Sequence, residues 1–170
     1  VEVRVVAAGL NFADVLNAMG VYPTLDGNPP VIGIECVGYV TARGSNVDWL
    51  EIGQRVIALG PGSFGSHLTT LADLVVPVPD ALSDGEVATV GVAYLTAWHA
   101  LCEVGRLAPG ERVLIHSATG GVGLAAVAIA YLPSHAAAQM APTIELQQMR
   151  HAGEFHVPLN KSQILRLDTP

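Results

Sequence analysis

Residues 111–130, with the sequence ERVLIHSATGGVGLAAVAIA, constrain the fold of this chain more than any other stretch. They predict a buried strand at 113–116, a glycine-rich turn at 117–123 and a helix of small residues from about Gly121 onward. Glycines in such a turn let the backbone approach a pyrophosphate, and the helix N-terminus offers unpaired N–H groups and the positive end of a dipole. The stretch therefore predicts the first unit of a dinucleotide-binding fold, with a purely structural strand-to-helix turn as the alternative.

The residues before position 83 predict a different architecture. Short apolar segments with glycine and proline between them favour a barrel-like, all-β domain with one small helix capped by Asn11. These segments are 1–10, 31–42, 52–59, 67–70 and 74–78. Ser83 and Glu86 then form a capping box, which predicts a helix whose apolar stripe runs on to Leu101. We therefore expect a β domain in residues 1–82 and an α/β segment in residues 83–130.

Composition narrows the class of protein. The chain is 51% hydrophobic and 14% charged, so it can form a substantial core, and its net charge of −7 disfavours a nucleic-acid partner. Its two cysteines favour a reducing cytoplasm over a disulfide framework. The sequence has no leader pattern and no apolar run long enough to span a bilayer, so no membrane association is expected.

The segment GIECVG at residues 33–38 has the skeleton G-x-E-x-x-G, with aliphatic Ile34 in its second place. A zinc site needs several Cys and His ligands, which two distant cysteines do not supply, so no metal is expected. Glu35 lies in an apolar run. We interpret it as a buried carboxylate that pairs with a backbone group or with an arginine such as Arg55.

Three polar residues near the N-terminus are candidates for a site. Asn11 and Asp14, on the predicted small helix, could orient a substrate or a cofactor amide, and helix capping is the alternative; the two roles are compatible. Tyr22 follows in a loop, where its hydroxyl could donate a proton or hydrogen-bond to a polarised carbonyl. Simple packing of the ring is the alternative for Tyr22.

Several ordered motifs resemble one family. They are GLNFADVLNAMGVYP at 9–23, PVIGIECVGYV at 30–40, EIGQRVIAL at 51–59, GVAYLTAWHAL at 91–101 and the opening stretch at 111–130. Together they resemble the enoyl reductase domain of type I polyketide and fatty acid synthases, in particular mycocerosic acid synthase-like enzymes. This domain belongs to the medium-chain dehydrogenase/reductase superfamily. Within that resemblance, the aliphatic residue Ile34 implies the zinc-free branch.

The resemblance implies a GroES-like β domain followed by the truncated start of a Rossmann domain, hence an α/β fold with a large all-β part. It implies NADPH as cofactor, hydride transfer to an α,β-unsaturated acyl thioester on an acyl carrier domain, and neighbouring synthase domains as partners. Tyr22 matches a tyrosine associated with proton delivery. The residues that match cofactor-binding positions are Asn11, Asp14, Thr96, Ala118, Gly120, Gly121, Val122 and Gly123.

Residues 131–170 depart from the family and show no second strand–helix unit. A complete doubly wound sheet needs roughly 150 residues, so most of it is missing from this chain. The apolar face of the helix that begins near Gly121 then needs another cover, which leaves a homodimer open. Three functions follow: an enoyl reductase domain that is weak or inactive in this truncated form, a quinone oxidoreductase-like enone reductase, or a non-catalytic structural fragment.

Overall fold

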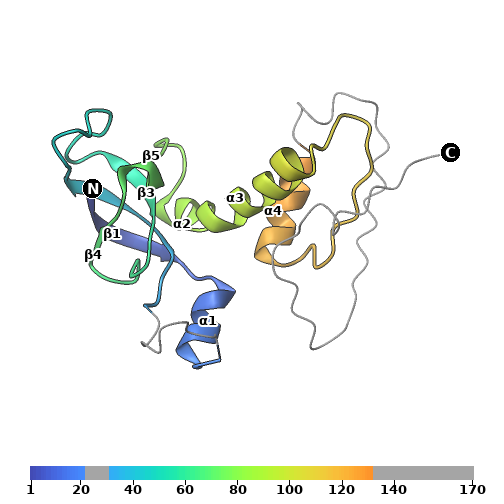
Figure 1. Ribbon diagram of the computed structural model, residues 1–170, viewed down its shortest axis with the longest axis horizontal. Coiled ribbons are helices and arrows are strands. Elements are labelled where there is room, and N and C mark those ends of the chain that lie inside the picture. The colour runs from blue at the N-terminus through green and yellow to red at the C-terminus, as the bar shows by residue number, and fades with distance from the viewer. Residues whose placement is uncertain (22–30, 132–170) are drawn as a thin grey trace. The chain divides into compact units, whose positions relative to one another are not determined.

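The computed structural model describes residues 1–21 and 31–131 of the 170-residue chain. The chain divides into two compact units, Val1–Val92 and Ala93–Pro170. Figure 1 shows strands throughout the first unit, whereas the described part of the second consists mainly of helix and connecting loop. Each unit is therefore considered by itself.

The first unit is built on one five-stranded antiparallel sheet with the strand order β4-β1-β2-β3-β5. Its strands are β1 (Glu2–Gly9), β2 (Glu35–Ala42), β3 (Arg55–Leu59), β4 (His67–Thr69) and β5 (Val75–Pro77). A short helix, α1 (Phe12–Ala18), follows β1, and a 3₁₀ turn, η1 (Ala72–Leu74), precedes β5. The predicted all-β part with one small helix is confirmed, although β2 begins four residues later than the predicted start at Val31.

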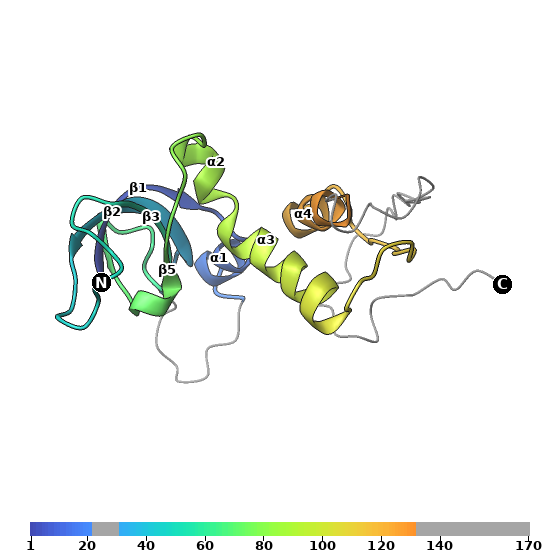
Figure 2. The same ribbon diagram turned by 90° about the horizontal axis from the view of Figure 1, so that it is seen from above.

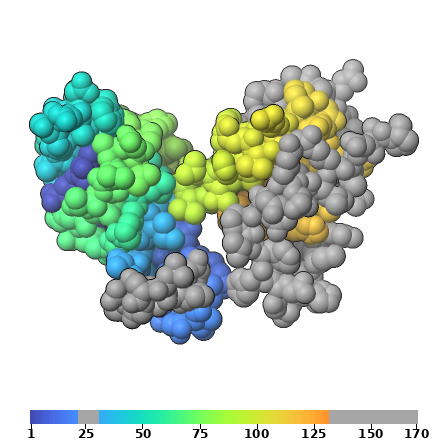
Figure 3. All heavy atoms as spheres, viewed as in Figure 1, coloured from blue at the N-terminus to red at the C-terminus, as the bar shows by residue number. Residues whose placement is uncertain are grey.

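The core of this unit lies along the central strands. Val3, Val40 and Val56 are almost completely buried, as alternation along half-buried strands requires. Gly38 is paired with Val5, and a Cβ at Gly38 would clash with the Arg4 carbonyl, so this strand position requires glycine. The long connection between β2 and β3, cyan in Figure 3, forms an exposed lobe of the unit that is anchored by buried Leu50.

The helix predicted to run from the capping box to Leu101 is wrong in one respect, because it is interrupted. The chain forms α2 (Asp84–Ala88), then α3 (Gly91–Trp98) and a π-helical turn, η2 (His99–Val104). In an unbroken helix the Val92 N–H would donate to the Ala88 carbonyl. It donates instead to the side chain of Glu35, and Thr89 and Val90 separate the two helices.

In the second unit, α3 and the glycine-rich turn share a core with α4 (Gly121–Ala130), which confirms the predicted small-residue helix. Figure 2 shows α3 continuing into η2, with α4 as a separate helix. Ala97, Ala118 and Ala125 belong to the same cluster of buried side chains. Small residues therefore let the two helices and the turn pack closely.

The buried strand predicted at 113–116 is wrong. Val113 forms only an isolated β-bridge, although Ile115 is buried at 6% exposure. A parallel strand is stabilised by flanking strands on both sides, and the described residues of this unit contain no such ladder. No helix among the described residues is long and apolar enough to cross a membrane.

Candidate functional site

Glu35, at the start of β2, lies at the centre of a buried polar network. Its Oε1 accepts a 2.7 Å hydrogen bond from Asn11 Nδ2, and its Oε2 accepts one of 2.7 Å from the Val92 N–H. The side chain is only 3% exposed. The backbone partner expected for Glu35 is therefore confirmed, whereas Arg55 pairs elsewhere.

Two glycines make room for this carboxylate. A Cβ at Gly9 would lie 2.6 Å from Glu35 Oε1, and a Cβ at Gly91 would overlap Oε2. Glycine is required at both positions by this packing, although neither backbone has a positive φ. Neither requirement was predicted from the sequence. Gly9 lies near the end of a predicted strand segment and Gly91 inside the predicted helix, and neither position by itself indicates contact with a distant side chain.

Asp14 is a second buried carboxylate close by, with 1% exposure. Its Oδ2 accepts a 2.9 Å hydrogen bond from the Asn11 N–H, and its Oδ1 accepts one of 2.8 Å from the Gly33 N–H. Asp14 thus caps α1 and holds the segment before β2, where Gly33 has φ of +94°. Helix capping, one of the two roles considered for Asp14, is what its contacts provide.

Asn11 is held from two sides as a result. Asp14 binds its backbone N–H, Glu35 binds its side-chain amide, and Asn11 itself is half-buried. Of the two candidates on this helix, Asn11 is therefore the more accessible. Tyr22, the candidate proton donor, lies outside the described residues.

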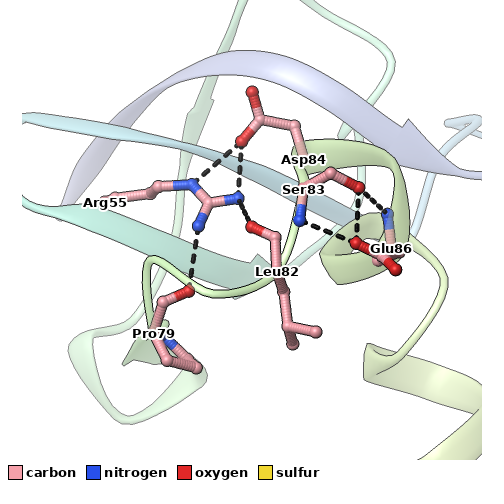
Figure 4. Close-up of polar contacts among 6 residues, drawn as sticks. All are labelled: Arg55, Pro79, Leu82, Ser83, Asp84 and Glu86. Atoms are coloured by element: carbon pink, nitrogen blue, oxygen red, sulfur yellow. Dashed lines mark hydrogen bonds and ion pairs between the residues drawn. The ribbon is translucent and has the colours of Figure 1, made fainter.

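Arg55, on β3, clamps the segment that leads into α2 (Figure 4). Its Nε donates to Asp84 Oδ1 at 2.9 Å, and its two terminal nitrogens donate to the carbonyls of Pro79 and Leu82 at 3.1 and 2.8 Å. A terminal nitrogen also forms an ion pair of 2.7 Å with Asp84. The guanidinium thereby satisfies acceptors on three residues and fixes the start of α2 against the sheet.

The capping box predicted at the start of α2 is confirmed. The Ser83 N–H donates to Glu86 Oε2 at 2.8 Å, and the Glu86 N–H donates to Ser83 Oγ at 3.3 Å (Figure 4). The Ser83 hydroxyl also donates to the Glu86 carboxylate, and this bond, followed by that from the Ser83 backbone, lowers the pKa of Glu86 from its usual value.

The glycine-rich turn has the geometry of an open backbone cradle. Ser117 has φ of +51°, and a Cβ at Gly123 would clash with the Ser117 carbonyl, so the turn is closed tightly on that side. Gly120 and Gly121 are exposed, and a Cβ at Gly121 would meet nothing within 4 Å. The backbone is thus bare on the side where a phosphate would approach.

The start of α4 completes this cradle. The Leu124 N–H donates to the Gly120 carbonyl at 2.8 Å and begins the helical ladder. The N–H groups of the three preceding residues, 121–123, therefore have no partner within the helix. Such N–H groups, at the positive end of a helix dipole, favour an anion such as a pyrophosphate.

The remaining candidates lie around the same core. Ala118 is 9% exposed and packs in the core, whereas Val122 is 39% exposed. Thr96 is half-buried on α3, next to Ala97, which shares a core with Ala118. Among residues 1–21 and 31–131, no three His, Cys, Asp or Glu side chains gather in a way that could hold a metal ion.

The first unit belongs to a known class of domain. Residues 1–80 match the family model described as "Alcohol dehydrogenase GroES-like domain". The match covers the whole sheet, from β1 to β5.

The relatives of the chain are polyketide synthases of mycobacteria. It is 79% identical over 130 residues to a phenolphthiocerol/phthiocerol polyketide synthase of Mycobacterium tuberculosis, a match to 76% of this chain and 6% of that protein. It is 46% identical over 131 residues to a mycocerosic acid synthase-like polyketide synthase of the same species, again 76% of this chain and 6% of the relative. The chain thus spans about 6% of the length of these relatives.

The chain is also similar to solved structures of enoyl reductases and related oxidoreductases. The crystal structure of CurK enoyl reductase superposes with a TM-score of 0.71 at 41% identity, over 76% of this chain and 42% of that one. Mycobacterial Rv1454c complexed with NADPH gives a TM-score of 0.68 at 33% identity, over 76% and 40%. The chain is therefore similar to enoyl reductases of the medium-chain dehydrogenase/reductase superfamily, and the predicted resemblance and fold class are confirmed.

Proposed function

We propose that this chain is part of an enoyl reductase domain that uses NADPH to reduce an α,β-unsaturated acyl thioester. The observation that supports this most strongly is the open cradle at Gly120 and Gly121, at the N-terminus of α4. The similarity to an enoyl reductase structure and to a protein complexed with NADPH supports NADPH as the ligand of this cradle.

In this proposal each part of the chain has a limited task. NADPH, when bound, supplies the hydride for the β-carbon of the thioester. The backbone of residues 120–123 binds the pyrophosphate, with Ala118 packing beneath the turn and Val122 beside it. Asn11 and Thr96 contact the cofactor, Asp14 holds Asn11 in place, and Tyr22 delivers the proton to the α-carbon.

The substrate and partners follow from the relatives. These are large multidomain synthases, so the acyl group would arrive as a thioester on an acyl carrier domain, with other synthase domains adjacent. The cysteine usage of the sequence favours a cytoplasmic setting. The described residues contain little of a nucleotide-binding fold beyond the cradle, so we propose weak cofactor binding by this chain alone.

The test is a fluorescence titration of NADPH with two matched valine variants. In Gly121→Val the new Cβ has no protein atom within 4 Å, and the side chain should obstruct the phosphate, so NADPH affinity should fall about tenfold or more. Gly85→Val, on α2, also places its side chain in open space and should leave the affinity unchanged. Equal affinity of wild-type protein and Gly121→Val would refute the proposal.

A version of the chain joined to the remaining nucleotide-binding region of its 79% identical relative separates the alternative reactions. NADPH oxidation with an enoyl thioester but not with a quinone supports the synthase-type reaction, and the reverse preference indicates a quinone reductase. Absence of NADPH binding by the wild-type chain indicates a structural fragment.

A further inference from the structure

Glu35 is a buried carboxylate that the proposed function does not use. We propose that Glu35 is a positioning residue, which fixes the carboxamide of Asn11 in one orientation for the cofactor and anchors the first turn of α3. This inference rests on the proposed function, because it is Asn11 that would contact the cofactor.

The two oxygens of Glu35 have separate partners. Oε2 accepts from the Val92 N–H, and that bond alone would suffice to cap α3. Oε1 accepts from the amide nitrogen of Asn11, 24 residues earlier in the chain. Rotation of the Asn11 amide would break this hydrogen bond, which is buried at the Glu35 end.

The surroundings prevent Glu35 from adopting another position. Gly9 and Gly91 lie against its two oxygens so closely that neither could carry a side chain. Asp14 fixes the backbone N–H of Asn11 independently, at 2.9 Å. Half-buried Asn11 is thus held by two carboxyl groups with 3% and 1% exposure, Glu35 at its side-chain amide and Asp14 at its backbone N–H, as expected for a site residue supported by a second layer.

Glu35→Gln is the informative variant, because it keeps the shape of the side chain and removes one acceptor. Asn11 Nδ2 and the Val92 N–H both donate, so the amide of glutamine can satisfy only one of them. Glu86→Gln is the matched control, since Glu86 is exposed and serves only the cap of α2.

The first measurement needs no cofactor. In ¹⁵N NMR spectra, the side-chain amide of Asn11 is assigned from the signal that Asn11→Ala lacks. Its hydrogen exchange should be about tenfold slower than that of exposed Asn46 in the wild-type protein. The protection should disappear in Glu35→Gln and persist in Glu86→Gln. Wild-type exchange as fast as that of Asn46 would overturn the proposal, even if Glu35→Gln failed to fold.

The second measurement is a double-mutant cycle for NADPH affinity. Glu35→Gln and Asn11→Ala should each weaken binding about tenfold, and the double variant should be no weaker than Asn11→Ala alone. Additive losses would mean that Glu35 acts only on the fold and would overturn the positioning role. Failure of the wild-type chain to bind NADPH would overturn the proposed function, and the Asn11 exchange rate would still decide whether Glu35 fixes that amide.

Discussion

At the scale of single residues, the structure depends on glycines that serve different purposes. Gly9 and Gly91 leave space for the Glu35 carboxylate, Gly123 closes the glycine-rich turn, and Gly121 leaves it open. Gly121 and Gly123 could be identified from the sequence, because glycines between a predicted strand and a predicted helix indicate a tight turn. It could not identify the first two, because their reason is a contact with a residue distant in the sequence.

Alanine substitutions can test whether a glycine is required by packing. Gly91→Ala should destabilise the protein by about 1–3 kcal/mol, since the new methyl group overlaps the Glu35 side chain and displaces a buried polar group from its partners. Gly85→Ala, on α2 with open space around it, should stabilise by about 0.5–1 kcal/mol through helix propensity. Urea denaturation measures both values, and stabilisation by Gly91→Ala would contradict the packing described for Glu35.

At the scale of elements, local signals were reliable where a motif is complete within a few residues. The capping box of Ser83 and Glu86 is present as predicted, and α1 begins at Phe12 after Asn11. Prediction failed where an element depends on distant partners. The predicted long helix breaks at Thr89 and Val90, next to the Val92 N–H that donates to Glu35, and the strand predicted around Val113 has no flanking strands among the described residues.

The capping box gives a pH dependence. Hydrogen bonds from the Ser83 hydroxyl, and then from its backbone, depress the pKa of Glu86 below the ordinary value of 4.5. A depressed carboxyl pKa stabilises the fold above the unfolded-state pKa, and this stability is lost as the pH falls through the folded-state value. The stability difference between wild-type protein and Glu86→Gln should therefore shrink below pH 4.5.

Chemical denaturation at a series of pH values measures this difference. Ser83→Ala should move the pKa of Glu86 back towards 4.5, which NMR titration of the side chain would detect. An unchanged Glu86 titration in Ser83→Ala would show that the cap does not act on the carboxylate.

At the scale of the whole molecule, the first unit and the described part of the second differ in completeness. The first unit has a sheet with a continuous core, and its class was predictable from strand spacing and motifs. The described part of the second unit supplies a cradle, two packed helices and one isolated bridge. A nucleotide-binding fold needs further strand–helix units to bind the rest of the cofactor.

We therefore expect this chain alone to reduce crotonyl-type thioesters poorly or not at all. NADPH oxidation followed by absorbance should show little turnover above a buffer control. A version of the chain joined to the remaining nucleotide-binding region of its 79% identical relative should show clear turnover. Steady turnover by the short chain, abolished in Gly121→Val, would contradict this expectation.

The positions of the two cysteines give each unit its own chemical reporter. Cys36 has no exposed surface and lies in the sheet, where burial raises the pKa of its thiol. Cys102 is half-buried and lies in η2 of the second unit, where burial also raises the pKa of its thiol. Thiol-specific alkylation requires the thiolate, so each cysteine reacts mainly when its surroundings open. Peptide-resolved mass spectrometry of an alkylation time course should show Cys102 modified well before Cys36. The two rates would give separate opening free energies for the sheet and for the helical unit, without any added label or mutation.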